Sequence, residues 1–378
     1  MILPSQKHLF DIPEDVSYLN CAYMSPQLRD VGAAGEKALA LKSRPWEITP
    51  EDFFAESEAA RGLFARISGG DADGVAIIPS VSYGMAVAAA NLSVHEGQSI
   101  LVLEEQFPSN VYPWRELARR RGAELVTAPR PLDDDWTAAL LDRIDGDTAI
   151  VAAPNCHWTD GSLVDLARVG AAVREAGAAL VVDATQSLGA HPLDVAEVRP
   201  DFLVSAAYKW LLGPYSLGFM YVGEAYREGT PIEHNWIARE RSEDFARLVD
   251  YRDGFQPGAR RYDVGERSNF VLSPMATTAM RRILDWGVEN ISETTGLLTD
   301  RIERAAAELG LEATPADKRG RHMIGLRLGP DAPPDLAARL AAENVYVSVR
   351  GASLRVSPHL YNDAGDVDRL FAALAEVL

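Results

Sequence analysis

The chain has 378 residues with a formal net charge of −18, and 47% of its residues are hydrophobic. This length predicts two domains, and so acidic a surface argues against nucleic acid or an anionic membrane as a partner. Two cysteines, Cys21 and Cys156, are too few for a disulfide framework, so we expect a cytoplasmic protein. We expect neither a signal peptide nor a membrane-spanning segment, and the seven histidines lack the close spacing of a metal site.

Short apolar runs alternate with helical patterns through the first two-thirds of the chain. Most of these runs are continuously apolar, which is typical of strands that helices cover on both faces. The candidate strands are 74–78, 99–103, 124–127, 148–152, 179–183, 201–205 and 217–222. The clearest helical patterns between them are 114–121 and 163–176. This alternation predicts a mostly parallel α/β sheet.

The composition changes at residues 253–268, a stretch rich in glycine, arginine and aspartate. A long helical pattern follows from Pro274 to about Leu309, and Gly310 is a natural stop. Beyond it we expect strands at 322–328, 345–349 and 353–356, a helix at 334–343 and a closing helix from about residue 366. We predict an N-terminal segment 1–17 that packs on the small domain, a large domain 18–255 and a small α+β domain 256–378.

Two of the predicted strands are followed by residues with reactive side chains. The first ends at Asp183, at the edge where open parallel sheets bind ligands, although an aspartate there could equally cap the next turn. The second leads to Lys209, which lies between Tyr208 and Trp210. Burial among such neighbours favours a neutral amine that can attack an aldehyde, whereas a lysine at a strand end could also extend to water.

The segments VVDATQSLGA and VSAAYKWLLGP together resemble the aspartate and lysine motifs of the class V aminotransferase family. This family belongs to the fold-type-I enzymes that use pyridoxal 5′-phosphate (PLP), and it includes cysteine desulfurases, kynureninases and isopenicillin-N-epimerase-like proteins. The resemblance extends from Tyr18 to the last helix. It implies a large PLP-binding domain on a mostly parallel seven-stranded sheet and a smaller α+β C-terminal domain.

The resemblance assigns the cofactor contacts near the two motifs. Lys209 matches the Schiff-base lysine, and Asp183 matches the acid that keeps the pyridine nitrogen protonated, so that the ring can act as an electron sink. Gln186 matches a position near the phenolic oxygen. Where many relatives have serine and histidine as phosphate ligands, this chain has Ala206 and Tyr208. Tyr208 is therefore a candidate phosphate ligand, and Ser205 is an alternative to it.

Other cofactor contacts follow from segments farther from the lysine. Ser82 and the amides of Val81 and Ser82 match the phosphate site, because free N–H groups at a helix start bind phosphate, although Ser80 or Ser82 could be an ordinary cap. Phe107 matches the ring that stacks on the cofactor where many relatives have histidine, or it belongs to the core. Asn155 and His157 match a turn near the phenolic oxygen, and His157 is either a proton shuttle or a structural histidine.

The resemblance also implies substrate contacts and a homodimer with shared active sites. Arg355 matches the arginine that binds the substrate α-carboxylate, and Arg350 is a second candidate. Asn20, Cys21 and Ala22 lie in a segment that matches one reaching over the substrate. Residues Glu266, Ser268 and Asn269 match a loop that reaches the phosphate bound by the partner subunit in dimeric relatives. Without the resemblance, each of these segments could be an ordinary surface loop.

We expect an aminotransferase that acts on a small amino acid or amine. A Cβ-lyase, of the C–S or selenocysteine lyase kind, and an epimerase remain alternatives, and a non-catalytic PLP-fold binding protein is a distant one. A cysteine desulfurase is disfavoured, because the loop YVSVRGASLR lacks the nucleophilic cysteine of those relatives. We find no clear site for the aromatic substrate of a kynureninase. The glycine-rich motifs of nicotinamide dehydrogenases and P-loop enzymes are absent.

Overall fold

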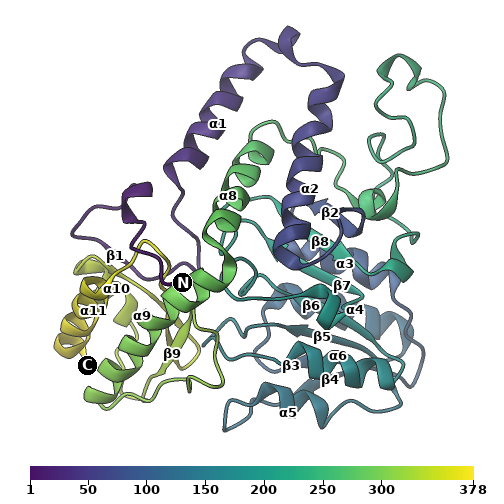
Figure 1. Ribbon diagram of the computed structural model, residues 1–378. Coiled ribbons are helices and arrows are strands. Elements are labelled where there is room, and N and C mark those ends of the chain that lie inside the picture. The colour runs from purple at the N-terminus through teal and green to yellow at the C-terminus, as the bar shows by residue number, and fades with distance from the viewer.

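The structure is a computed structural model that describes residues 1–378, and its centre is a seven-stranded sheet (Figure 1). The strand order is β2-β8-β7-β6-β5-β3-β4. Only β8 is antiparallel to its neighbours. The strands are β2 (Val75–Ile78), β3 (Ser99–Leu103), β4 (Glu124–Ala128), β5 (Thr148–Pro154), β6 (Ala179–Asp183), β7 (Phe202–Ala206) and β8 (Gly218–Val222). The mostly parallel seven-stranded sheet predicted from the sequence is therefore confirmed.

Helices cover both faces of this sheet, which explains why most of its strands are mainly apolar and buried, whereas the edge strand β4 leaves Glu124 and Thr127 exposed. Successive strand residues point to opposite faces, so Leu101 belongs to one apolar core and Val102 to the other. One core includes residues of α2 (Ala55–Ser68), α6 (Leu166–Glu175) and α8 (Leu272–Trp286). The other includes residues of α3 (Val81–Asn91) and α4 (Tyr112–Arg121). The remaining helices of this region are α1 (Arg29–Lys42), α5 (Trp136–Leu141) and α7 (Val195–Val198).

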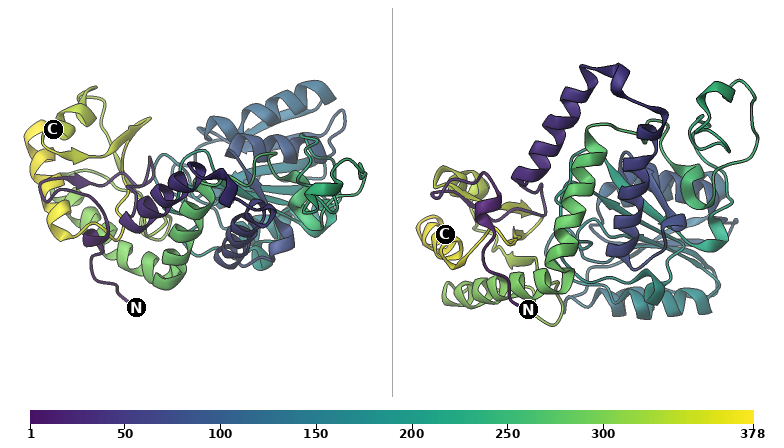
Figure 2. Two further views of the ribbon diagram at one scale, coloured as in Figure 1. Left: turned by 90° about the horizontal axis from the view of Figure 1, so that it is seen from above. Right: turned by 45° about the horizontal axis from the view of Figure 1, so that its top comes forward.

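A separate group of elements follows the sheet in the sequence and has its own apolar core. Its three-stranded antiparallel sheet has the order β11-β12-β9. Its strands are β9 (Ile324–Arg327), β11 (Ser348–Arg350) and β12 (Ser353–Val356), and a further short strand, β10 (Val345–Tyr346), lies outside this sheet. The helices of this group are α9 (Val288–Glu308), α10 (Leu336–Ala342) and α11 (Ala364–Val377). Both chain termini lie beside these elements (Figure 2). No helix of the structure combines the length and the apolar composition that a bilayer crossing requires.

The N-terminal segment contacts the C-terminal elements. Strand β1 (Ser17–Tyr18) pairs in parallel with β10, and the Gln6 amide donates to the Leu360 carbonyl at 2.7 Å. Helix α8, in contrast, packs on α1 and α2 beside the large sheet, whereas α9 packs on α11. The division at residues 17 and 255 stays a prediction, and these contacts associate α8 with the large sheet.

The long helical pattern from Pro274 to about Leu309 consists of two helices rather than one. Gly287 separates α8 from α9 and has a φ of +78°, which glycine adopts more readily than other residues. Because α8 and α9 pack on different parts of the molecule, the chain must turn between them. The sequence analysis did not identify Gly287 as this break, since a single glycine also occurs inside continuous helices.

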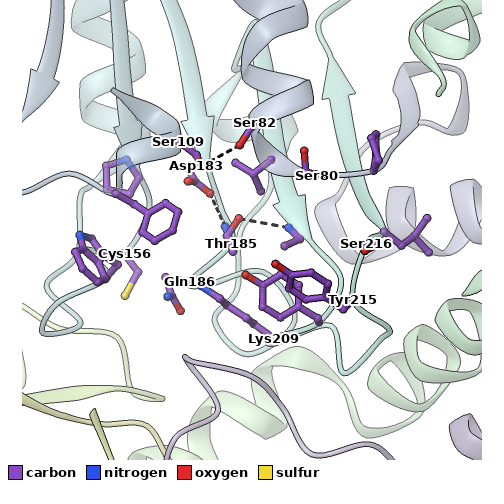
Figure 3. A pocket seen from close by; sticks show the side chains of 18 of the residues that line it. Ser80, Ser82, Ser109, Cys156, Asp183, Thr185, Gln186, Lys209, Tyr215 and Ser216 are labelled. Atoms are coloured by element: carbon purple, nitrogen blue, oxygen red, sulfur yellow. Dashed lines mark hydrogen bonds between the residues drawn. The ribbon is translucent and has the colours of Figure 1, made fainter. Parts of the chain in front are cut away.

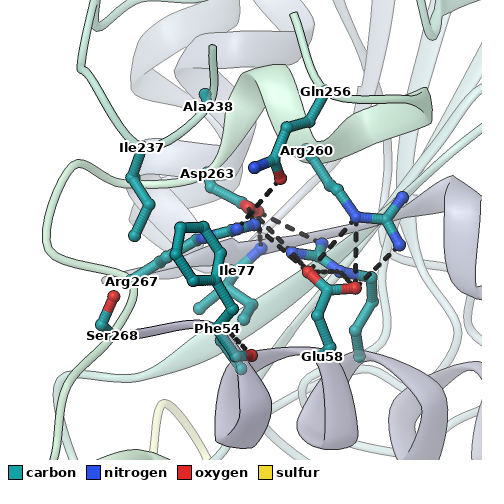
Figure 4. Close-up of polar contacts among 12 residues, drawn as sticks. Phe54, Glu58, Ile77, Ile237, Ala238, Gln256, Arg260, Asp263, Arg267 and Ser268 are labelled. Carbon is teal, nitrogen blue, oxygen red and sulfur yellow. Dashed lines mark hydrogen bonds and ion pairs between the residues drawn. The ribbon is translucent and has the colours of Figure 1, made fainter. Parts of the chain in front are cut away.

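A buried network of ion pairs fastens residues 258–267 to α2 (Figure 4). The fully buried Arg61 donates to Asp263 at 2.8 Å, and Arg267, also fully buried, pairs with the same carboxylate. Arg260 pairs with Glu58 at 2.7 Å. Because each buried charge has an opposite partner, the network offsets the cost of removing these charges from water.

Candidate active site

A cavity of about 280 Å³ lies at the edge of the large sheet where its parallel strands end (Figure 3). Its lining comes from residues that follow β2 and β3, from the ends of β5, β6 and β7, and from residues just before β8. Asp183 is the last residue of β6, and Lys209 lies three residues beyond the end of β7. The parallel arrangement therefore brings together side chains that are far apart in the sequence, at the edge where such sheets bind ligands.

Lys209 and Asp183 both line this cavity, as the sequence predicts. Lys209 is only 7% exposed, and its Nζ donates no hydrogen bond within the protein. Burial, assisted by Arg355 and Arg350, lowers the pKa of Lys209 to about 8. Burial raises the pKa of Asp183, while one of its carboxylate oxygens accepts the Thr185 amide at 3.0 Å. The site thus contains an amine that is easily neutralised, and near it a buried carboxylate with one oxygen still available.

Serine hydroxyls and free amides gather at the start of α3. Ser80 caps the helix by accepting the Tyr83 amide, and Val81 and Ser82 form the first turn, where amides have no carbonyl partner in the helix. The Ser82 hydroxyl is 3.0 Å from that of Ser109, and both residues line the cavity (Figure 3). The sequence analysis missed Ser109. Its position two residues after Phe107, in a turn beyond a strand end, is the only signal that could have suggested it.

Aromatic side chains form two walls of the cavity. The Phe107 and Trp158 rings meet edge to face at 5.4 Å, and the Tyr208 and Tyr215 rings lie 4.6 Å apart. The Lys209 Nζ is 5.6 Å from the ring centroids of Phe107 and Tyr208. Phe107 is 36% exposed and lines the cavity, so its surroundings do not support the core alternative. The sequence analysis did not select Trp158 or Tyr215.

Gln186 lines the cavity, and its amide group links the lysine turn to the N-terminal segment. Its Nε2 donates to the Ala22 carbonyl at 3.1 Å, and its Oε1 accepts from the Trp210 indole at 3.0 Å. Ala22 and Asn20 themselves do not line the cavity, and the Asn20 side chain accepts from Ser348. The substrate contacts expected for Asn20 and Ala22 therefore stay predictions.

Arg355 is buried in β12 without an acidic partner. It is 1% exposed, its Nη1 donates to the Trp158 carbonyl at 2.7 Å, and its Nε has no partner. Burial, together with Arg350, lowers the pKa of Arg355 to about 9. Since a buried charge without a counter-ion is costly, this guanidinium is a good candidate to bind an anion.

His157 and Asn155 do not line the cavity. The His157 ring is fully buried, stacks on Trp136 at 4.9 Å and has Thr159 and the Glu104 carbonyl as hydrogen-bond partners. Burial also lowers its pKa. This placement supports the structural alternative for His157 and not the proton shuttle. Asn155 lines a different groove, so the structure does not bring it together with Lys209.

Ser268 and Asn269 lie outside the cavity of their own chain. The Ser268 hydroxyl donates to the Phe53 carbonyl at 2.6 Å. The Asn269 side chain accepts the amides of Val271 and Leu272 at the start of α8. Both side chains therefore have local partners, and their predicted contact with a phosphate in a partner subunit stays a prediction.

Comparison with known proteins gives one consistent result. The family model described as aminotransferase class-V matches residues 48–370. An uncharacterized aminotransferase, YcbU of Bacillus subtilis, is 26% identical over 340 residues, which cover 86% of this chain and 84% of YcbU. Isopenicillin N epimerase of Streptomyces clavuligerus is also 26% identical over 340 residues, with 83% of each chain covered.

The solved structures that match confirm the fold class. The cystine C–S lyase C-DES, in complex with cysteine persulfide, superposes with a TM-score of 0.87 at 18% identity, covering 96% of this chain and 98% of C-DES. A C-DES mutant with glycine covalently linked to its PLP cofactor gives a TM-score of 0.88 at 17% identity, over 99% of this chain and all of the other. At these identities the similarity establishes the architecture alone.

Proposed function

The chain belongs to the class V aminotransferase family, and on this premise we propose that it converts a small α-amino acid, with Lys209 as the base that removes the Cα proton. The family resemblance that the sequence motifs indicate is confirmed. Enzymes of this family depend on PLP, so the cofactor expected from the sequence is confirmed as well.

The lining of the cavity matches the separate parts of this cofactor. The first turn of α3, with the hydroxyls of Ser82 and Ser109, suits a phosphate, since free amides and a helix N-terminus both favour an anion. The available oxygen of Asp183 suits a protonated pyridine nitrogen, and the Phe107 ring suits the face of a planar ring. Lys209 provides the amine that binds an aldehyde. When bound, PLP supplies an electron sink that weakens the bonds at the substrate Cα.

The observation that carries the proposal is the state of Lys209. The Lys209 side chain is buried except toward the cavity, its Nζ makes no hydrogen bond within the protein, and burial lowers its pKa to about 8, so a large share of the amine is neutral at slightly alkaline pH. A neutral amine can accept a proton from Cα and return it. We propose that Arg355 binds the substrate α-carboxylate, because its guanidinium is buried near the cavity without an acid.

Transamination is the reaction that we propose first. It requires one base that takes a proton from the substrate Cα and delivers it, on the same face, to a carbon two bonds away, and Lys209 is suited to that task. An epimerase matches the site less well, since protonation from the opposite face needs a second acid–base group. Phe107 cannot act as one, and His157 is held away from the cavity by its stack on Trp136. Two other candidates in the cavity wall are the phenols of Tyr208 and Tyr215, and burial raises the pKa of Tyr208.

Elimination at Cβ is the second candidate, because it begins with the same proton removal and the fold is shared with a C–S lyase. The two cysteines of this chain, which are both buried, do not suit a desulfurase that uses a cysteine nucleophile. Burial raises the pKa of Cys21 to about 12, and it raises the pKa of Cys156 as well. The Cys156 thiol also donates to the Gly161 carbonyl at 3.4 Å. Thiols in this state are poor nucleophiles.

The proposal includes a homodimer. Arg267 is fixed by the buried ion pairs, and it directly precedes Ser268 and Asn269, which do not line their own cavity. A rigidly held segment at the surface is suited to reach an active site in a second copy of the chain. The molecular mass in solution, measured with and without PLP, tests this part of the proposal, and a monomer with full activity contradicts it.

A single-turnover experiment tests the reaction. The protein is loaded with PLP, free cofactor is removed, and amino acids are added one at a time while the visible spectrum is recorded. Loss of the band of the lysine-bound cofactor with one equivalent of keto acid supports transamination. Continuous release of keto acid and ammonia with an unchanged band supports elimination. Absence of the band in the loaded protein contradicts the proposal, and Lys209→Ala is the matched control.

A further inference from the structure

Arg350 is a second cation near the active site that has no acidic partner. It ends β11, next to the β12 strand that contains Arg355, and it is half-buried. No aspartate or glutamate lies within ion-pair distance of Arg350 or Arg355. The other three buried arginines, Arg61, Arg267 and Arg319, all pair with acids. The β11–β12 hairpin therefore contains the one buried arginine without an acidic partner, Arg355, and beside it a half-buried arginine that also lacks one.

Both guanidinium groups contact the same cavity-lining residue, Trp158. Arg355 donates to its carbonyl, and Arg350 lies over its indole ring at 5.9 Å from the centroid. The indole itself is fixed, since its Nε1 donates to the Glu105 carbonyl at 2.7 Å. Neither guanidinium lines the cavity itself, and Arg350 lines a separate surface groove. A molecule that extends from the cavity past Trp158 nevertheless approaches both cations, because both contact this residue.

The charges around Lys209 are unbalanced. Arg355 and Arg350 both lower the lysine pKa, and Asp183 is the one carboxylate that raises it. Under the function proposed above, Asp183 pairs with the cofactor and Arg355 with the substrate α-carboxylate. The Arg350 guanidinium then has no anionic partner. A second acidic group on the substrate would provide one.

We infer that the substrate is an α-amino acid with an acidic group on its side chain, a carboxylate or a sulfinate, which Arg350 binds. This inference rests on the proposed function, because it assigns Arg355 to the α-carboxylate. A guanidinium donates two parallel hydrogen bonds to such a group, and a partly buried site screens the pair less than bulk water does. A neutral amide of the same shape loses this interaction and leaves the cation unpaired.

Arg327 provides a matched control. It lines the same surface groove as Arg350, next to the hairpin, but it pairs with Asp134 at 2.7 Å. Arg350→Gln and Arg327→Gln each remove one positive charge from this groove. Only the first removes a charge that the protein itself leaves unpaired.

The test measures binding with two kinds of probe on the PLP-loaded protein. Aspartate and glutamate are compared with asparagine and glutamine by titration of the cofactor spectrum. Succinate is compared with propionate by calorimetry, which needs no reaction at the cofactor. We expect each acid to bind about tenfold more tightly than its neutral or shorter counterpart, in line with a charged hydrogen bond. Arg350→Gln should remove this preference, Arg350→Lys should restore part of it, and Arg327→Gln should retain it.

Equal binding of acids and amides by the wild-type protein overturns the inference, and so does an unchanged preference in Arg350→Gln. Failure of the proposed function looks different. In that case no amino acid alters the cofactor spectrum, whereas the succinate preference and its loss in Arg350→Gln still report on Arg350. A spectrum that responds equally to aspartate and asparagine supports the proposed function and contradicts the role of Arg350.

Discussion

Two groups of arginines in this protein differ in how their charges are balanced. The first group belongs to the ion pairs that fasten residues 258–267 to α2, here called the anchoring network (Figure 4). It contains three cations and three acids, which are Arg61, Arg260 and Arg267 with Glu58, Asp73 and Asp263. Around the active site, Lys209, Arg350 and Arg355 have no ion-pair partner, and Asp183 is the one carboxylate that raises the lysine pKa. The same side-chain type therefore holds a segment in place in one region and awaits an anion in the other.

The difference has an energetic reason. A buried charge costs several kcal/mol unless an opposite charge or hydrogen bonds compensate it. The anchoring network compensates its charges within the chain and needs no ligand. At the active site the unpaired charges are not fully compensated within the chain. Anionic ligands that bind the folded state therefore increase the free energy of unfolding. Buried charges that lack an opposite partner thus indicate a binding site better than the number of charged residues does.

The largest expected effect comes from removing the amine at the centre of the unbalanced site. Lys209→Ala should abolish turnover, because no other primary amine lines the cavity to attach the cofactor. Borohydride reduction followed by mass spectrometry of peptides measures the attachment directly. A reducible cofactor adduct that persists in this variant would show that Lys209 is not the attachment point.

Replacing Asp183 should affect the rate of proton removal from Cα more than it affects PLP binding. In Asp183→Asn, the carboxamide cannot keep the pyridine nitrogen protonated, so proton removal from Cα should slow steeply while the cofactor stays bound. Stopped-flow exchange of the Cα proton, with bound cofactor measured in the same sample, separates the two effects. Wild-type rates in this variant would place the acid elsewhere.

The comparison predicts that losing an arginine lowers the free energy of unfolding much more in the anchoring network than at the active site. Arg61→Met should lower the free energy of unfolding by about 3–5 kcal/mol, because it leaves the Asp263 carboxylate buried with one partner fewer. Arg355→Met should cost less than about 1.5 kcal/mol in the ligand-free protein, since it leaves no buried acid behind and breaks one hydrogen bond. Urea unfolding of both variants measures the contrast, and equal losses would contradict it.

The smallest expected effect is a shift in the pH dependence of the rate at which PLP attaches to the protein. Attachment of PLP to the ligand-free protein needs the neutral Lys209 amine, so its rate should rise with pH up to about 8 and level off above that value. Arg355 lowers this pKa, so Arg355→Gln should move the curve to higher pH. Absorbance kinetics across a pH series provide the measurement. An unchanged pH profile in Arg355→Gln would show that the charge of Arg355 does not affect the pKa of Lys209.

The sequence by itself determined the large sheet and the centre of the site. Most of the seven strands are local apolar runs. Asp183 ends one of them and Lys209 lies three residues beyond another, so their place at the sheet edge can be derived from neighbours in the sequence. The arginine of the β11–β12 hairpin, Arg355, was likewise identified through the motif around it. These inferences depend on residues within a few positions of one another.

Only the tertiary structure decided the features that depend on distant neighbours. His157 looked suitable as a proton shuttle, but Trp136, 21 positions earlier, covers its ring. Ser109 meets Ser82 through two different turns, and Trp158 joins the cavity to the arginines. The physical reason is that burial, charge balance and hydrogen-bond partners are properties of a packed neighbourhood, and a linear pattern does not specify which distant side chains complete it.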